Sequence, residues 1–463
     1  MPSLRSALLL LPLSLSLAAP AACQRTARDP VPPPSETSAA QPIEQRPLAV
    51  AAAASDPAAS AVASDPATSA ATDPAAPPAA EIAHDKRPGK PLSKNVHQGL
   101  DWLVSHQLPS GGWGQGDESP QMRGNAQQTL RDTANVADTS MALLALMRTG
   151  STPSAGTYSA PIRRGIEFIL SEVEASDEES LFVTNVRGTR VQGKIGTYVD
   201  TFTGLLALTE VKGKMPDAKS NKRVDAALTK VLNKIERNQQ ADGTWANQGW
   251  APVLTQSLAA KGLNRAAQSG EDVDEDTLRR VEDQAASSFD TTTGAVSGAG
   301  SAGVDLYSRA ANSASLRDSM TTRKTKEGDL RRQASSGKTE TERREAQQKL
   351  AENSRAEQTT EAAEKALLDR LDDPSFIQGF GNNGGEEFLS YMLVSEALAA
   401  KGGEEWTTWD AKISKLVNRV QNGDGSWTGH HCITGRTFCT AAALLVLMAD
   451  RGTGAVAAQI QHG

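Results

Sequence analysis

The chain has 463 residues, of which 4% are aromatic, and its formal net charge is -7. This length suits two or three domains, or one large ring or barrel, and the weak charge excludes a strongly basic surface for nucleic acid. Lysine and arginine (48 residues) are scattered among aspartate and glutamate (55 residues), so the mild acidity indicates solubility and defines no partner.

The first 22 residues have the features of an export signal. Arg5 precedes an apolar run from Leu8 to Leu17, and the small residues from Ala18 to Ala22 offer a cleavage site. The run is too short to span a bilayer as a stable helix. It ends at Cys23, which resembles the acylated cysteine of bacterial lipoproteins, although Pro20 stands where that motif prefers leucine. Ordinary cleavage that leaves Cys23 as a free thiol is the alternative.

Residues 23–92 are rich in Ala, Pro, Ser and Asp and read as a tether. SDPA occurs at Ser55 and Ser64, and TDPA at Thr72. Such a stretch has too little apolar side chain to offset the entropy of ordering, so we predict a disordered linker. If the lipoprotein resemblance holds, Gln24 implies an outer-membrane anchor with the protein facing the periplasm.

From residue 93 to residue 452 the chain repeats one pattern, an amphipathic helix followed by a helix that is apolar nearly all round. In the last repeat Trp409, Ile413 and Val417 share one helical face, and the apolar run from Ala441 to Met448 follows. A helix without a polar face must be buried on every side, so the amphipathic helix is expected to cover it. Earlier apolar helices are expected over 141–147, 205–208, 252–263, 304–314 and 386–400.

Six such pairs predict an all-α fold in which six inner helices surround an axis and six outer helices cover them, an (α/α)6 toroid. A polar, charged insertion from about residue 320 to residue 361 interrupts the pattern. It has no sustained heptad seam, so we favour a solvated helical arm or a partly disordered excursion over a partner-binding coiled coil. Residues 453–463 form a short tail.

Three of the pairs contain a turn in which glutamine is followed, a few residues later, by glycine, one further residue and tryptophan. The turns run from Gln107 to Trp113, from Gln240 to Trp245 and from Gln421 to Trp427. Glycine permits a tight reversal, the glutamine amide can satisfy unpaired groups at a helix end, and the indole seals the seam between pairs. This motif resembles the prenyltransferase and squalene oxidase repeats of the squalene cyclase and protein prenyltransferase superfamily. The resemblance covers about residues 92–452 and implies the alpha/alpha toroid.

The resemblance also implies that a functional cavity lies where the inner helices begin. N-capping explains Asp138 and Asp200 better than acid–base chemistry does, because each precedes a threonine at a helix start. The helix dipole explains the first-turn acids Glu386 and Glu387 about as well as function does. The cavity candidates are Asp138, Tyr198, Asp200, Trp250, Asp305, Glu386, Glu387, His430, His431, Cys432 and Arg436.

The chemistries of the superfamily find little support in these residues. A terpene cyclase needs a buried acid and an aromatic lining, but the chain has no Asp-x-Asp-Asp motif and few aromatics outside the repeat turns. A prenyltransferase needs zinc held by aspartate, cysteine and histidine. The last repeat offers His430, His431 and Cys432, without the paired aspartate and cysteine on the preceding inner helix. No catalytic residue, cofactor or metal is therefore assigned.

The favoured function is a non-catalytic binding or docking module in the cell envelope. A ring of apolar inner helices would form a central pocket for a lipid, isoprenoid or peptide, and its surface could dock another envelope protein. Nucleic acid is not expected. The alternative is an enzyme of the terpenoid cyclase or prenyltransferase type that uses the cavity around His430, His431 and Cys432.

Cys432 and Cys439 are the only cysteines left in an exported chain if Cys23 is acylated, and they are predicted to form a disulfide. Within one helix seven residues would separate them by about 10 Å. A turn at Gly435 would let Cys432 fold back toward Cys439. The rival is a zinc site that uses Cys432 with a neighbouring histidine.

Overall fold

The computed structural model describes residues 89–119, 130–381 and 383–452, all of them in the compact unit from His84 to Gly463. The predicted signal peptide, Cys23, the linker up to residue 88 and the tail lie outside the described residues. The described part contains fourteen α-helices and one sheet of two short strands, so the expectation of an all-α fold is confirmed. None of these helices is both long enough and apolar enough to cross a lipid bilayer.

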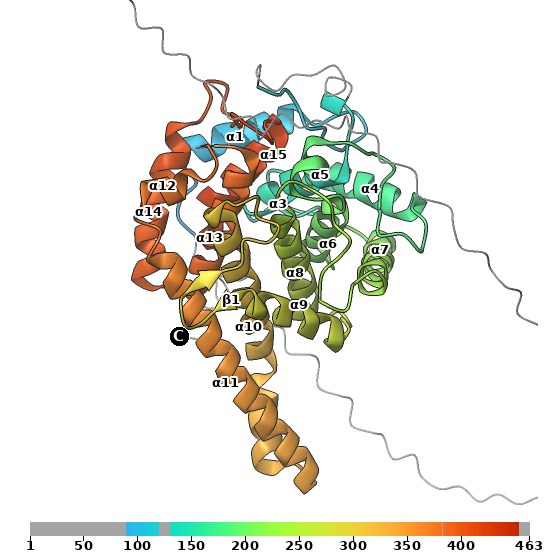
Figure 1. The fold of residues 1–463 in the computed structure, drawn as a ribbon. Coiled ribbons are helices and arrows are strands. Elements are labelled where there is room, and N and C mark those ends of the chain that lie inside the picture. The colour runs from blue at the N-terminus through green and yellow to red at the C-terminus, as the bar shows by residue number, and fades with distance from the viewer. Residues whose placement is uncertain (1–88, 120–129, 382, 453–463) are drawn as a thin grey trace, which may run out of the picture. The chain divides into compact units, whose positions relative to one another are not determined.

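Six helices that are buried over most of their length, or in α10 over the first half, contact one another in a cyclic order (Figure 1). They are α3 (Val136–Met147), α6 (Val199–Val211), α8 (Pro252–Gln268), α10 (Asp305–Ser336), α13 (Gly385–Lys401) and α15 (Arg436–Leu447). Each packs against the next, and α15 packs back against α3. In α3, α6, α13 and α15 the sequence is apolar nearly all round, and a helix of that kind is stable only when other helices cover it, whereas α8 and α10 also bury polar side chains.

Amphipathic helices cover these inner helices. They are α1 (Lys94–Ser105), α4 (Ser159–Ala175), α7 (Ala218–Arg237), α9 (Glu275–Ser287), α11 (Glu340–Leu368) and α14 (Gly403–Arg419). In α7, which packs on α6, the buried residues Val224, Leu228, Val231 and Ile235 recur every three or four positions. The shorter elements are α5 (Arg190–Ile195), α12 (Pro374–Gln378), the 3-10 turn Ala449–Arg451 and the antiparallel strands β1 (Phe289–Asp290) and β2 (Ala295–Val296).

The inner helices begin at the same end of the body. Val253 N, in the first turn of α8, donates a hydrogen bond to Gly300 O ahead of α10. Gly385 N, at the start of α13, donates one to Ile433 O ahead of α15. Because each start lies beside the start of its neighbour, residues that are far apart in the sequence meet at this end.

The three Gln–Gly–Trp turns make one repeated set of hydrogen bonds. In each turn the indole N–H donates, at 2.8 Å, to a carbonyl in the last turn of the preceding outer helix. Carbonyls at a helix end lack the partner that a continuing helix would supply, so the tryptophan caps the helix. The tryptophan–carbonyl pairs are Trp113–Leu103, Trp245–Ile235 and Trp427–Val417.

The glutamine of each turn links successive outer helices rather than capping its own. The amide of Gln107 donates to Pro161 O in α4 at 2.9 Å, and the amide of Gln239 donates to Thr277 O in α9 at 3.2 Å. Both glutamines precede their tryptophan by six positions. The expectation that Gln240 holds this position in the middle turn was therefore wrong by one residue.

Charged side chains join four inner helices inside the body. Lys261 Nζ on α8 lies 2.8 Å from Asp318 Oδ2 on α10 and 3.1 Å from Glu396 Oε2 on α13. Arg148, directly after α3, pairs with the other oxygen of Glu396, and Arg265 pairs with Asp318 at 3.4 Å. The Lys261, Asp318 and Glu396 side chains are at most 7% exposed. The interior of the body therefore contains a buried network of ion pairs at this place.

The predicted insertion is a helical arm formed by α10 and α11 (Figure 1). α10 continues from its buried first half to Ser336, and α11 begins with a capping box on Thr339. The base of the arm is packed: Met320 is 2% exposed, and Arg323 pairs with Glu282 of α9 at 2.8 Å. Between residues 331 and 345 no side chain is buried.

We expect the tip of the arm to be dispensable and the base to be required. Replacing residues 331–345 with a Gly-Ser bridge should change Tm by less than about 2 °C, because no buried side chain is lost. Replacing residues 320–361 also removes Met320 and Arg323, and should lower Tm by more than about 5 °C. Thermal unfolding followed by circular dichroism compares the two. Equal, small changes would show that the base does not stabilise the body.

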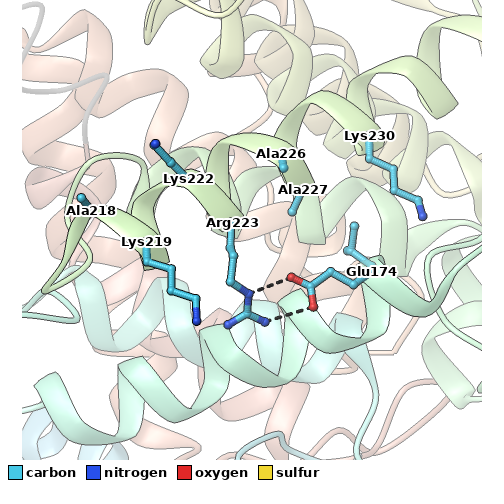
Figure 2. Close-up of a pocket in the computed structure, with 9 residues that line it drawn as sticks. Glu174, Ala218, Lys219, Lys222, Arg223, Ala226, Ala227 and Lys230 are labelled. Atoms are coloured by element: carbon cyan, nitrogen blue, oxygen red, sulfur yellow. Dashed lines mark hydrogen bonds and ion pairs between the residues drawn. The ribbon is translucent and has the colours of Figure 1, made fainter.

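A groove of about 630 Å³ lies on the outer surface between α4 and α7 (Figure 2). Its lining combines the small apolar residues Ala226 and Ala227 with lysines and one arginine of α7. Arg223 Nε lies 2.8 Å from Glu174 Oε1, across the groove, and Arg223 pairs with a second glutamate of α4. Ion pairs across this groove therefore join the two outer helices. None of the residues that line it belongs to the start of an inner helix.

Candidate functional site

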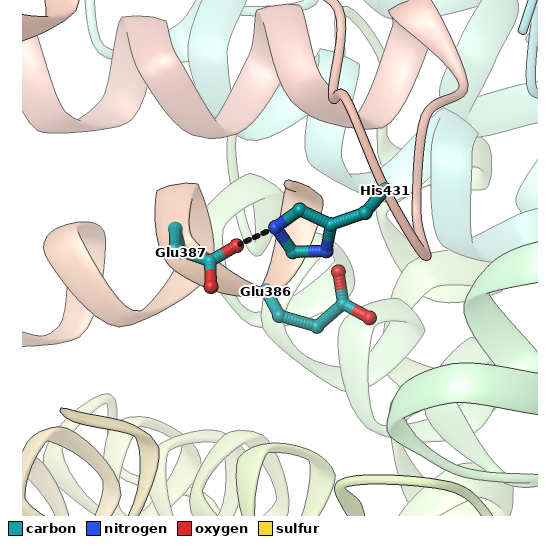
Figure 3. A group of neighbouring side chains, drawn as sticks. All are labelled: Glu386, Glu387 and His431. Atoms are coloured by element: carbon teal, nitrogen blue, oxygen red, sulfur yellow. Dashed lines mark ion pairs between the residues drawn. The ribbon is translucent and has the colours of Figure 1, made fainter. Parts of the chain in front are cut away.

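Three of the residues selected from the sequence come together where α13 begins. Glu386 and Glu387 lie in the first turn of α13, and His431 lies in the loop before α15 (Figure 3). One ligand atom from each residue lies within 4.8 Å of the other two. Both carboxyl groups are fully buried, whereas the His431 side chain is 14% exposed. The packing of α13 against α15 brings the acids to the histidine.

Glu387 is held by several donors. Its Oε1 accepts hydrogen bonds from the Tyr307 hydroxyl at 2.5 Å and from Phe380 N at 2.9 Å. Its Oε2 accepts one from Gly384 N at 2.8 Å, which caps α13, and lies 3.3 Å from His431 Nε2. Burial alone would raise the pKa of Glu387, but the interaction with His431 and these hydrogen bonds lower it below its ordinary value.

Glu386 is only partly satisfied. Its Oε2 accepts a hydrogen bond from Ile433 N at 3.2 Å, whereas its buried Oε1 has no hydrogen-bond partner among the described residues. Burial, and then the charge of Glu387, raise the pKa of Glu386 to about 7. The Nδ1 atom of His431 has no hydrogen-bond partner within the described part of the chain, and its Nε2 atom contacts only Glu387 Oε2, at 3.3 Å. Leaving such atoms unpaired costs about 1–3 kcal/mol each, so a further partner for these atoms would stabilise the cluster.

Aromatic rings border the cluster. Phe380 packs edge-on against His431 and Trp250, with ring centroids 5.2 Å and 5.0 Å apart. Trp250, directly before α8, also contacts Tyr307 at 6.1 Å. Lys194 Nζ lies 5.8 Å from the Trp250 centroid. Trp250 and Phe380 are half-buried, so the aromatic border reaches the surface.

The loop from Gly379 to Gly385 approaches the carboxylates closely. Gly379 has a φ of +61°, and a Cβ there would lie 2.6 Å from Glu387 Oε1. A Cβ on Gly384 would lie 2.8 Å from Glu387 Oε2. A larger residue at either position would occupy the space in which Glu387 accepts backbone N–H groups. In the sequence, this run of glycines is the signal for a close approach of the backbone to the carboxylates.

Asp138 and Asp200 lie outside this cluster, and neither caps its own helix as predicted. The N-cap of α3 is Asn135, whose Oδ1 accepts a hydrogen bond from Asp138 N at 2.9 Å. Asp200 accepts one from Ala137 N at 2.9 Å and so joins α6 to the start of α3. Asp138 Oδ2 accepts one from Asn135 Nδ2 at 2.7 Å, and burial raises the pKa of Asp138 to about 7.

The other candidates lie in separate contacts. His430 is exposed, and Arg436 pairs with Asp424 of the last repeat turn at 2.5 Å. Asp305 pairs with Arg309 at 2.9 Å within the first turns of α10. The ring of Tyr198, ahead of α6, contacts the ring of Phe182 at 4.9 Å. The structure thus selects His431 from the histidines of the last repeat, and adds Tyr307, Phe380 and Lys194, which sequence reasoning did not place at the site.

The predicted disulfide between Cys432 and Cys439 is not formed, and both side chains are buried. Cys439 Sγ, in the first turn of α15, lies 3.6 Å from Ile433 O and donates to it. Cys432 has a φ of +53° in the preceding loop. The turn at Gly435 therefore brings Ile433, rather than Cys432, toward Cys439. Cys432 also does not belong to the group of metal-ligating side chains that Glu386, Glu387 and His431 form.

No protein-family model matches the chain, and no curated protein matches it significantly. The chemistry of the cluster is therefore the basis on which a function is inferred for this protein.

Proposed function

We propose that the described body is an (α/α)6 toroid that holds one divalent metal ion and works as a metal-dependent binding module. The cyclic contacts of the inner helices support the toroid, and the three Gln–Gly–Trp turns support a relation to squalene cyclase and prenyltransferase repeats. The metal proposal depends on one observation. Glu386 Oε1 and His431 Nδ1 are buried beside Glu387 without hydrogen-bond partners in the described residues, and ligand atoms of all three residues lie within 4.8 Å of one another.

The donor set fits a first-row divalent ion. Two carboxylates and one imidazole suit Zn²⁺ best, with Mn²⁺ and Fe²⁺ as further candidates. Three protein ligands leave a coordination position for an external ligand, as in zinc sites that bind substrates. The positive charge would offset the repulsion between Glu386 and Glu387 in a buried place. When bound, the ion would act as a Lewis acid toward an oxygen atom of the ligand.

The surrounding residues would orient the metal ligands. The Tyr307 hydroxyl and Gly384 N hold the Glu387 carboxylate in one position, and Ile433 N holds Glu386. Groups that fix a ligand in this way contribute roughly 10- to 100-fold to metal affinity. The proposal differs from a module with an apolar central pocket, because its binding site is a polar cluster with an aromatic border.

Metal analysis of two neighbouring histidine variants tests the proposal. We expect the wild type, loaded with Zn²⁺ and desalted, to hold about one ion per chain by inductively coupled plasma mass spectrometry. His431→Ala removes a ligand and should weaken Zn²⁺ binding by at least about 100-fold, the upper end of what losing an orienting group costs. His430→Ala removes an exposed imidazole one position earlier and should bind as the wild type does.

Thermal unfolding gives a second readout. Zn²⁺ at about 100 times its Kd should stabilise the wild type and His430→Ala by about 2.7 kcal/mol and leave His431→Ala unchanged. A zinc content at background level in the loaded wild type would contradict the site. An equal loss of zinc affinity in His430→Ala and His431→Ala would contradict it as well.

We also propose that the chain is an exported lipoprotein, supported by the apolar run and by Cys23. Cys23→Ala should move the protein from the membrane fraction to the soluble fraction of the envelope, because no acyl chain would be attached. Cys439→Ala, which removes a buried thiol, is the matched control and should stay with the membrane. If Cys23→Ala and the wild type partition alike, the anchor does not exist.

A further inference from the structure

We infer that the ligand of this site is an organic carboxylate with a planar, apolar body. This inference rests on the proposed metal function and adds the chemical class of the ligand. It comes from the charge balance of the cluster and from the rings beside it.

With a divalent ion bound, the cluster and the neighbouring Lys194 would together carry one net positive charge. A divalent ion would balance Glu386 and Glu387, and His431 would be neutral as a metal ligand. Lys194 has no acidic partner among the described residues, and it borders the cluster through the ring of Trp250, which packs on Phe380 beside His431. A ligand with a single carboxylate would neutralise this one positive charge, whereas a phosphate or diphosphate would bring more negative charge than the site can neutralise.

The aromatic border fits the body of such a ligand. The planes of Trp250 and Phe380 meet at 75°, so the two rings do not stack on each other. Both are half-buried, which leaves part of each ring to a molecule at the surface. Lys194 lies near the ring of Trp250, so a ligand cation would meet repulsion there and an anion attraction. A flat carboxylate would therefore place its charge near Lys194 and the metal, and its body against the rings.

A second lysine–tryptophan pair provides the control. Lys90 Nζ lies 5.4 Å from the ring centroid of Trp406, which is half-buried and belongs to α14, away from the cluster. Lys90 also pairs with Asp410, so this second pair shows whether a lysine–tryptophan contact binds aromatic acids when the lysine charge is already matched.

Isothermal titration of the zinc-loaded full chain with 2-naphthoate tests the inference, after the zinc content of each sample has been measured. We expect 2-naphthoate to bind at least about 10-fold more tightly than uncharged 2-acetylnaphthalene and than 2-naphthyl phosphate. Lys194→Gln and Trp250→Leu should each weaken 2-naphthoate binding by about 10-fold and keep one zinc per chain. Lys90→Gln and Trp406→Leu should change neither value.

The outcomes separate the two proposals. One zinc per chain without 2-naphthoate binding, or with binding that Lys194→Gln leaves unchanged, overturns the ligand class and leaves the metal site standing. The ligand class is also overturned if 2-naphthyl phosphate binds more tightly than 2-naphthoate, or if Trp406→Leu weakens 2-naphthoate binding as much as Trp250→Leu does. A wild type that takes up no zinc overturns the metal site itself.

Discussion

Lys261→Met should lower the free energy of unfolding by about 3–5 kcal/mol, the usual cost of leaving a buried charge without its partner. Methionine keeps the length and the apolar stem of lysine, but it leaves Asp318 and Glu396 without the cation that they share. Glu396 shows how far these carboxylates depend on cations. Burial would raise its pKa, but Arg148 and then Lys261 lower it to about 2.

Urea denaturation measures the effect, as a lower midpoint at an unchanged slope. Lys326→Met is the matched control: Lys326 pairs with Glu275 at 3.1 Å on the surface, and its loss should cost less than about 1 kcal/mol. Adding Glu396→Gln to Lys261→Met should restore part of the loss, because Asp318 keeps Arg265 and only Arg148 then lacks its carboxylate partner. A loss below about 1 kcal/mol for Lys261→Met would mean that water reaches these carboxylates.

Asp138→Asn should stabilise the protein above pH 7 and leave it nearly unchanged at pH 4. The pKa of Asp138 is about 7 in the folded state, raised from 3.8 by burial and, to a smaller extent, by Asp200 and Glu118. The folded state therefore binds this proton more tightly than the unfolded state does. The stability that this proton contributes is fully present below about pH 4 and is lost as the pH rises through 7.

The shift corresponds to an upper limit of about 4 kcal/mol at pH 8, which asparagine should recover because it carries no charge. Urea denaturation of both proteins at pH 4, 6 and 8 measures the difference. Asp225→Asn, on the exposed face of α7, is the control and should show no such pH dependence. If Asp138→Asn were less stable than the wild type at pH 8, Asp138 would be ionised and well paired in the folded state.

The inner helices could be predicted from the sequence because burial on every side requires an apolar sequence on every side. The expected helices over 252–263 and 386–400 correspond to α8 and α13. The arm was less predictable. Its helices are supported by local ion pairs such as Glu327–Arg331, which leave no apolar face to reveal the helical period.

The candidate site could be predicted only in part. The helix starts drew attention to Glu386, Glu387 and His431, but their meeting depends on the packing of α13 against α15, which no local pattern encodes. Asp200 shows the same limit. An acid in a first turn looks alike whether it caps its own helix or, as here, the neighbouring one.

This capping of one helix by the next has a consequence for the order in which the protein folds. The hydrogen bond from Ala137 N, at the start of α3, cannot form until Asp200, which lies 63 positions later in the chain, has been synthesised. The last contact, of α15 with α3, joins segments about 300 residues apart. At roughly 5–20 residues per second, a ribosome needs about 15–60 s to make that stretch. The first inner helix therefore leaves the ribosome long before its final neighbour exists, and the native state becomes available only to the finished chain.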